Sequence, residues 1–151
     1  MSEVVWFGTP ATLKHLQKTD LRLSVGADSI EPSEVVRDLG VFLDSELTMR
    51  QHVGNVASLC YSHLRRLKKV RRILGPIITS RLVCAFMTSH VDYCKALLAG
   101  LPQSIITQLQ RIQNVAVRLV RNLRPCDKVS ASLRELHWLL IRYRIIYKSC
   151  A

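Results

Sequence analysis

Residues 51–76 read QHVGNVASLCYSHLRRLKKVRRILGP, and the periodicity of this stretch decides the fold. Its apolar residues recur at three- and four-residue steps, at Val53, Val56, Ala57, Cys60, Leu64, Leu67 and Leu74. This spacing places them on one face of an α-helix. The glycine and proline at Gly75 and Pro76 predict where that helix ends. We therefore expect an amphipathic helix over residues 51–74.

The helical pattern continues to the end of the chain. We expect helices at about 77–92, 103–121 and 130–138, the last with Ser130 as a candidate N-cap, and a further helical stretch over 141–147. Gly100-Leu101-Pro102 separates the first two of these. The inward-facing residues are expected to be Ile78, Leu82, Ala85 and Phe86 in the first helix and Ile105, Leu109, Ile112, Ala116 and Leu119 in the next.

Before residue 50 the pattern favours short strands. Strands are predicted at 3–7, at 21–25 and at 36–43, the last interrupted at Gly40, with a turn at 26–29. The predicted fold class is therefore α+β and mostly α, with a small N-terminal antiparallel segment of two or three strands before a bundle of four or five helices. The predicted division is into residues 1–49 and residues 50–151.

The charge is distributed unevenly between these two parts. Residues 1–49 carry four basic against eight acidic side chains, whereas residues 50–151 carry eighteen basic against three acidic ones, which together give the net charge of +11. Such a field favours a polyanion, either a phosphate backbone or an anionic membrane surface. A solvated basic surface without a specific partner is the alternative.

The densest basic segment is residues 65–72, with six positive charges in eight residues. At 100° per residue, one face of this helix packs and the other presents cations, as the tracking of a phosphate backbone requires. A nuclear-localisation signal and a solvated face are the competing interpretations. With a sparser row on the third helix, the candidate nucleic-acid-binding residues are Arg65, Arg66, Lys68, Lys69, Arg72, Arg111, Arg118 and Arg121.

No constellation for catalysis is found in the sequence. No two acidic residues are adjacent, and the six glycines form no phosphate-binding loop. Cys60 and His63 have the spacing of half a zinc site, as His90 and Cys94 lie one helical turn apart, but no second pair follows at a suitable distance. We therefore expect no catalytic residue, metal or cofactor in this chain.

Cysteine usage and the N-terminus bear on the compartment. The five cysteines are odd in number and widely spaced, which suits reduced thiols in an intracellular, nuclear or cytoplasmic, protein. The N-terminus does not resemble a signal peptide, so we expect no secretion. No uninterrupted run of about 18 apolar residues occurs, so we expect no membrane span.

Five phrases in order carry a resemblance to a known family. They are EVVWFGT at 3–9, LGVFLD at 39–44, the segment 92–102 with DYC, LL and GLP, LQRIQNVA at 109–116 and LRELHWL at 133–139. Together they resemble the C-terminal part of the reverse transcriptase of non-LTR (LINE-type, Jockey-like) retrotransposons. The similarity covers essentially the whole chain.

The resemblance implies that the two parts of the chain correspond to two parts of a polymerase. Residues 3–48 would correspond to the end of the polymerase palm, whose catalytic aspartates lie upstream of residue 1 in this family. Leu39, Gly40 and Val41 would lie near the primer grip, and residues from about 51 onward would form the thumb that holds a template–primer duplex by its backbone. In this family a lysine and a threonine usually precede the glutamate that corresponds to Glu3, and this chain has Met1 and Ser2 in their place.

A second departure concerns the proline that usually follows His-Trp-Leu, where this chain has Leu140. Family members also continue well beyond residue 151. The expected function is thus that of a truncated, non-catalytic reverse-transcriptase remnant that binds RNA, DNA or a hybrid duplex without sequence preference. The alternatives are a helical adaptor whose basic face meets an acidic protein or an anionic membrane, and an expressed relic without function.

Overall fold

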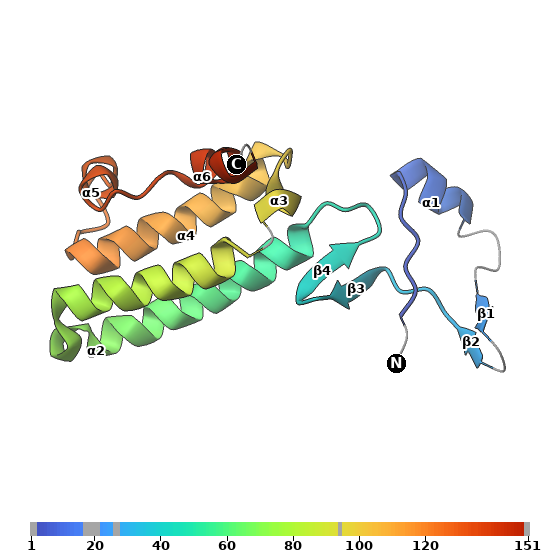
Figure 1. Cartoon of the computed structure of the whole chain (residues 1–151), viewed down its shortest axis with the longest axis horizontal. Helices are drawn as coiled ribbons and strands as arrows, with labels where there is room; N and C mark the ends of the chain where they lie inside the picture. The colour runs from blue at the N-terminus through green and yellow to red at the C-terminus, as the bar shows by residue number, and fades with distance from the viewer. Residues whose placement is uncertain (1–2, 17–21, 26–27, 94, 150–151) are drawn as a thin grey trace. The chain divides into compact units, whose positions relative to one another are not determined.

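The computed structural model describes residues 3–16, 22–25, 28–93 and 95–149. The chain divides into two compact units, residues 1–52 and residues 53–151. Short antiparallel strands lie in the first unit and helices make up the second (Figure 1). The α+β, mostly helical fold class is thereby confirmed.

The first unit contains one short helix and two strand pairs. Helix α1 spans Pro10–Leu16, and it was not predicted. Strands β1 (Leu23–Val25) and β2 (Asp28–Ile30) pair antiparallel, as do β3 (Val35–Asp38) and β4 (Val41–Asp44).

Two strand predictions and one turn prediction need correction. Residues 3–7 form no strand but a single parallel bridge between Val4 and Pro32, because no second strand runs beside them. Residues 36–43 form a hairpin instead of one interrupted strand. Within the predicted turn at 26–29, residues 28 and 29 belong to β2. Residues 26 and 27 lie outside the described residues, as does residue 21 of the strand predicted at 21–25.

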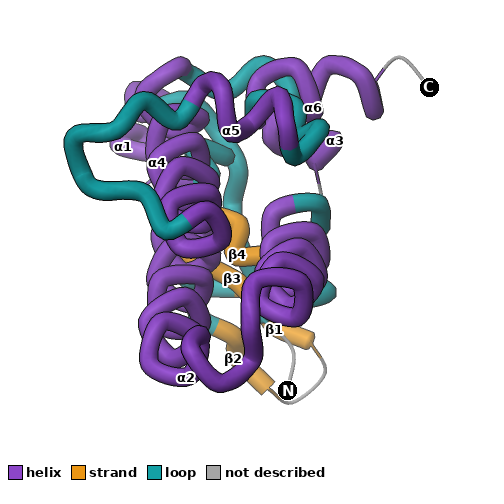
Figure 2. Tube along the Cα trace, turned by 90° about the vertical axis from the view of Figure 1, so that its left-hand side faces the viewer, coloured by secondary structure: helices purple, strands orange, loops and turns teal. Residues whose placement is uncertain are grey.

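Helix α2 spans Arg50–Val91 and consists of two antiparallel halves. The chain reverses at Gly75, whose φ of 74° and ψ of 171° are outside the helical region. The two halves run side by side, and α4 lies along them (Figures 1 and 2). The predicted end of the first helix at Gly75 and Pro76 is therefore confirmed.

The remaining helices follow the predicted order. They are α3 (Lys95–Leu98), α4 (Gln103–Arg121), α5 (Ser130–Glu135) and α6 (Ile141–Ser149), of which α3 was not predicted. Ser130 does not cap α5: the N-cap position is held by Val129, and no side-chain hydrogen bond caps the helix.

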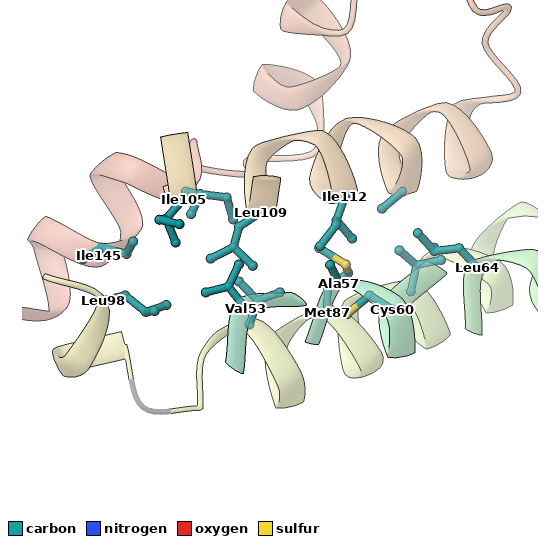
Figure 3. Packing of buried hydrophobic residues seen from close by; sticks show 14 of the residues in the cluster. Val53, Ala57, Cys60, Leu64, Met87, Leu98, Ile105, Leu109, Ile112 and Ile145 are labelled. Atoms are coloured by element: carbon teal, nitrogen blue, oxygen red, sulfur yellow. The ribbon is translucent and has the colours of Figure 1, made fainter. Parts of the chain in front are cut away.

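The core of the second unit is built by α2, α4 and α6 together with α3. In Figure 3, Val53, Ala57, Cys60 and Leu64 from the first half of α2 point toward Leu109 and Ile112 of α4, with Met87, Leu98 and Ile145 closing the cluster. The predicted stripe of the first helix is buried at its centre, while Val56 and Leu74 are partly buried at its edges. In α4, Val120 is buried where Leu119 was expected.

The predicted inward face of the second half of α2 is correct at Leu82 and Phe86, which pack partly buried against the core, and wrong at Ile78 and Ala85, which are exposed. Ile78 is 50% exposed, and the buried row is instead Thr79, Val83, Met87 and Val91. Thr79 is polar but can be buried in this row, because its hydroxyl donates a hydrogen bond of 2.7 Å to the carbonyl of Gly75.

Helix α2 also bears on the question of a membrane span. One 18-residue window within it has a mean hydropathy of 1.2, with 18% of the window buried, and is long and apolar enough to cross a membrane by length and composition alone. We expected no span from the absence of an uninterrupted apolar run. One such helix is weak evidence, because a core helix of a soluble protein passes the same test.

Candidate nucleic-acid interface

Five cations project from the first half of α2. Arg65, Arg66, Lys68, Lys69 and Arg72 are all exposed, whereas Leu64 and Leu67 between them are buried against the core. The helical period separates the two faces. Among the described residues, none of the five cations has an ion-pair partner. We refer to these five residues as the α2 basic face.

Arg71, the sixth cation of this segment, has a different role. It lies on the packed side of α2, and its Nη1 donates a hydrogen bond of 2.5 Å to Oδ1 of Asn122. Asn122 ends α4 in the left-handed conformation at φ 55°, with its backbone N–H donating to the carbonyl of Arg118. This contact ties the end of the α2 basic face to the C-terminal end of α4.

The three arginines predicted on α4 are not equivalent. Arg118 is half-buried, and its Nε is buried without a hydrogen-bond acceptor in the described structure. Arg121 is exposed and pairs with Glu135 at 2.6 Å. Arg111 is also exposed, but it lies two turns before Arg118, about 10 Å along the helix axis. The contact with Asn122 therefore places the C-terminal end of α4, which carries Arg118 and Arg121, beside the part of α2 just before its turn, and Arg111 lies apart.

The α2 turn and the end of α4 also enclose a hollow of about 370 Å³. Its lining is apolar at Pro76, Ile77, Val120 and Leu136 and polar at Ser80, Arg81 and Arg121. Arg81 was missed in the sequence because it stands alone after the turn, outside any basic run. Arg81 lies beside α4 only because the chain returns between the end of α2 at Val91 and the start of α4 at Gln103.

The turn itself exposes large apolar side chains. Ile73 is 86% exposed, Ile77 is 69% exposed and Val70 is also exposed. Ile73 lies three and seven residues after Val70 and Arg66 respectively, so it continues one outward face of the helix. An apolar tip thus lies next to the α2 basic face.

The residues compared with a primer grip form the turn of the β3–β4 hairpin. Leu39 and Gly40 have φ values of 45° and 84°, the positive sign that a tight two-residue hairpin turn requires. Leu39 is 83% exposed, whereas Val41 is buried. Asp44, at the end of β4, accepts hydrogen bonds from the Thr48 hydroxyl and from the amides of Thr48 and Met49. Burial alone would raise the pKa of Asp44, but these hydrogen bonds hold it below its ordinary value.

Cys60 and His63, the pair with the spacing of half a zinc site, take part in packing. Burial raises the pKa of the Cys60 thiol to about 11, which keeps it protonated. The His63 ring stacks on Phe86 with centroids 4.6 Å apart and on His90 at 5.8 Å. Within the described ranges, no group of three His, Cys, Asp or Glu side chains converges as a metal site would need. Cys94 and Cys150 lie outside the described residues.

The polar residues of the LQRIQNVA phrase have structural partners. Gln113, 1% exposed, donates from Nε2 to the Leu139 carbonyl at 2.8 Å. Gln110 donates to Gln113 and Asn114, and its Oε1 accepts from the amide of Ile141 at the start of α6. These side chains fasten the segment before α6 to α4, so they are not free to bind a ligand.

No family model, no curated protein and no solved structure matches this chain.

Proposed function

We propose that the second unit binds nucleic acid through the phosphate backbone, without sequence preference. The observation that carries the proposal is the exposure of the five cations of the α2 basic face, which have no ion-pair partner among the described residues, together with the placement of Arg81 and Arg121 around one hollow beside the α2 turn. Exposed guanidinium and ammonium groups create a positive potential that attracts a polyanion to the surface that carries them.

The resemblance to non-LTR retrotransposon reverse transcriptases leads to a more specific proposal. We propose that the chain is a fragment of such an enzyme, with a palm end in residues 1–49 and a thumb in residues 50–151, and that it does not polymerise by itself. The hairpin turn at Leu39 and Gly40 is compatible with the primer-grip comparison. Because the sequence offers no paired carboxylates for two-metal phosphoryl transfer, primer extension by the purified chain should give no product. Extension would contradict this part of the proposal.

A salt titration of the full chain tests the binding proposal. Affinity for a DNA duplex of random sequence is measured by filter binding between about 50 and 200 mM salt. Six phosphate contacts would lower it about 1,000-fold over this range, since each adds about 0.9 to the slope of log affinity against log salt concentration. Affinity that is unchanged by salt would contradict the electrostatic proposal.

Matched variants locate the contacts. Arg66→Ala with Lys69→Ala removes two charges from the α2 basic face and should flatten the slope by about 2. Arg50→Ala with Arg142→Ala removes the same charge from exposed positions outside this surface and should leave the slope unchanged. The fourfold replacement of Arg65, Arg66, Lys69 and Arg72 by alanine should have the largest effect, with helix content retained in circular dichroism. Equal effects of the two double variants would show a response to net charge alone.

A further inference from the structure

We infer that the hollow beside the α2 turn is a subsite for one unpaired nucleotide, so that the basic end of the second unit favours single-stranded over duplex nucleic acid. The inference rests on the proposed function and specifies its ligand. The lining of the hollow offers apolar contacts for a base and polar groups for a phosphate or sugar. Ile77, Val120 and Leu136 are apolar, and Arg81, Arg121 and Ser80 are polar.

The size of the hollow fits this ligand. Its volume of about 370 Å³ lies near the lower end of the range of small-molecule sites, about 300–1,000 Å³. It has room for one nucleotide and not for a turn of duplex. In a duplex the faces of the bases are stacked on one another and cannot reach such walls, whereas an unpaired base exposes its face.

The chemistry of the two arginines fits as well. A guanidinium plane stacks on a base or pairs with a phosphate in bidentate geometry. Arg81 has no ion-pair partner within the described ranges. Arg121 is held by Glu135 at 2.6 Å through one Nη, which fixes its position at the rim and leaves its other donors available.

The surroundings of the hollow favour a strand over a free nucleotide. The α2 basic face ends at Arg72 and the hollow begins at Pro76, so a strand with one base in the hollow would have to pass round the α2 turn for its neighbouring phosphates to meet these cations. An apolar protein groove is disfavoured as the partner, because the cations around the turn would lose their water without gaining a counter-charge. An anionic bilayer meets the same charge requirement, and the experiment distinguishes it.

The test compares the full chain on two forms of one oligonucleotide. A 12-mer carries a single 2-aminopurine, whose fluorescence depends on stacking, and is used alone and as a duplex. We expect the emission of the single strand to change on binding and that of the duplex to stay constant. Ile77→Ala and Arg81→Gln should each weaken single-strand binding about 3- to 10-fold and duplex binding less than twofold.

Each variant has a matched control. Ile73→Ala removes an isoleucine that is 86% exposed on the other side of the turn and does not line the hollow, so it should leave both affinities unchanged. Arg72→Gln removes a cation of the α2 basic face and should weaken both forms equally. Because Ile77 is 69% exposed and Arg81 is exposed, neither replacement removes a core contact.

Three results would overturn the inference. Equal losses on single strand and duplex for Ile77→Ala and Arg81→Gln would mean that these residues act as general surface contacts. Binding to vesicles of anionic phospholipid that Ile73→Ala and Ile77→Ala both abolish, with single-strand affinity unaltered, would assign the turn to a membrane surface. If the unaltered chain binds neither form of the oligonucleotide, the proposed function fails and the inference with it.

Discussion

In the second unit, sixteen buried side chains form one continuous cluster, whereas in the described part of the first unit the buried apolar residues are Val36, Val41 and Met49. The first unit therefore depends mostly on local devices, namely the positive-φ turn at Leu39 and Gly40 and the hydrogen bonds to Asp44. The second depends on contacts between residues far apart in the chain. The two units are therefore stabilised by different kinds of contact, and single substitutions should distinguish local contacts in the first from long-range packing in the second.

The two tryptophans make this comparison measurable, because Trp6 lies in the first unit and Trp138 in the second. In a Trp6→Phe background the fluorescence reports unfolding of the second unit, and in a Trp138→Phe background it reports the first. The stability of each substituted chain is compared with that of a control variant, changed either at the same residue type or in the other unit.

The largest effect is expected at Ile112, which is 0% exposed in the core of the second unit. Ile112→Ala should lower its free energy of unfolding in urea by about 3–4 kcal/mol, through lost burial and the cavity left behind. Val36→Ala in the first unit removes a smaller, less enclosed side chain and should cost about 1 kcal/mol there. Equal losses at the two sites would break the contrast between the units.

Gln113 should come next. Gln113→Leu would leave the Leu139 carbonyl without its side-chain donor and remove one of the two acceptors of the Gln110 amide, at a cost of about 2 kcal/mol to the second unit. Gln103→Leu, at the exposed start of α4, should change the stability by less than about 0.5 kcal/mol. A neutral Gln113→Leu would mean that the buried amide is dispensable.

Gly75 tests the turn of α2. Its φ of 74° and ψ of 171° are accessible almost only to glycine, so Gly75→Ala should cost about 1–2 kcal/mol although no atom lies within 4 Å of the added Cβ. Gly54 provides the control, because it lies within the helix with equally open space. There Gly54→Ala should stabilise the second unit by about 0.5–1 kcal/mol. Destabilisation by both would contradict the conformational explanation.

The smallest effect is expected at Asp44 in the first unit, at about 1 kcal/mol for Asp44→Asn near neutral pH. Because hydrogen bonds lower its pKa in the fold, its contribution is complete above the ordinary value of 3.8 and is lost as the pH falls through the folded value. The variant and the unaltered chain should thus converge in acid unfolding followed by Trp6 fluorescence. Asp38→Asn, at an exposed position in the same unit, should change the stability near neutral pH by less than about 0.5 kcal/mol.

Sequence periodicity predicted most of the second unit and little of the first. The stripe from Val53 to Leu67 and the bounds of α4 were predicted because an amphipathic helix repeats its signal over many turns. The strands at β1–β2 and the bridge at Val4 were predicted poorly, because a strand of three residues repeats its signal barely once. The buried Thr79 was missed because its hydrogen bond to Gly75 exists only after the turn has formed.

For the candidate interface, helical spacing is enough to identify the cations of the α2 basic face, because it separates them from the apolar stripe. The contact of Arg71 with Asn122, the ion pair of Arg121 with Glu135 and the place of Arg81 beside α4 become visible only in the folded chain. The hollow forms because the chain returns between the end of α2 at Val91 and the start of α4 at Gln103, which brings residues about forty positions apart around it, a relation that no local pattern carries.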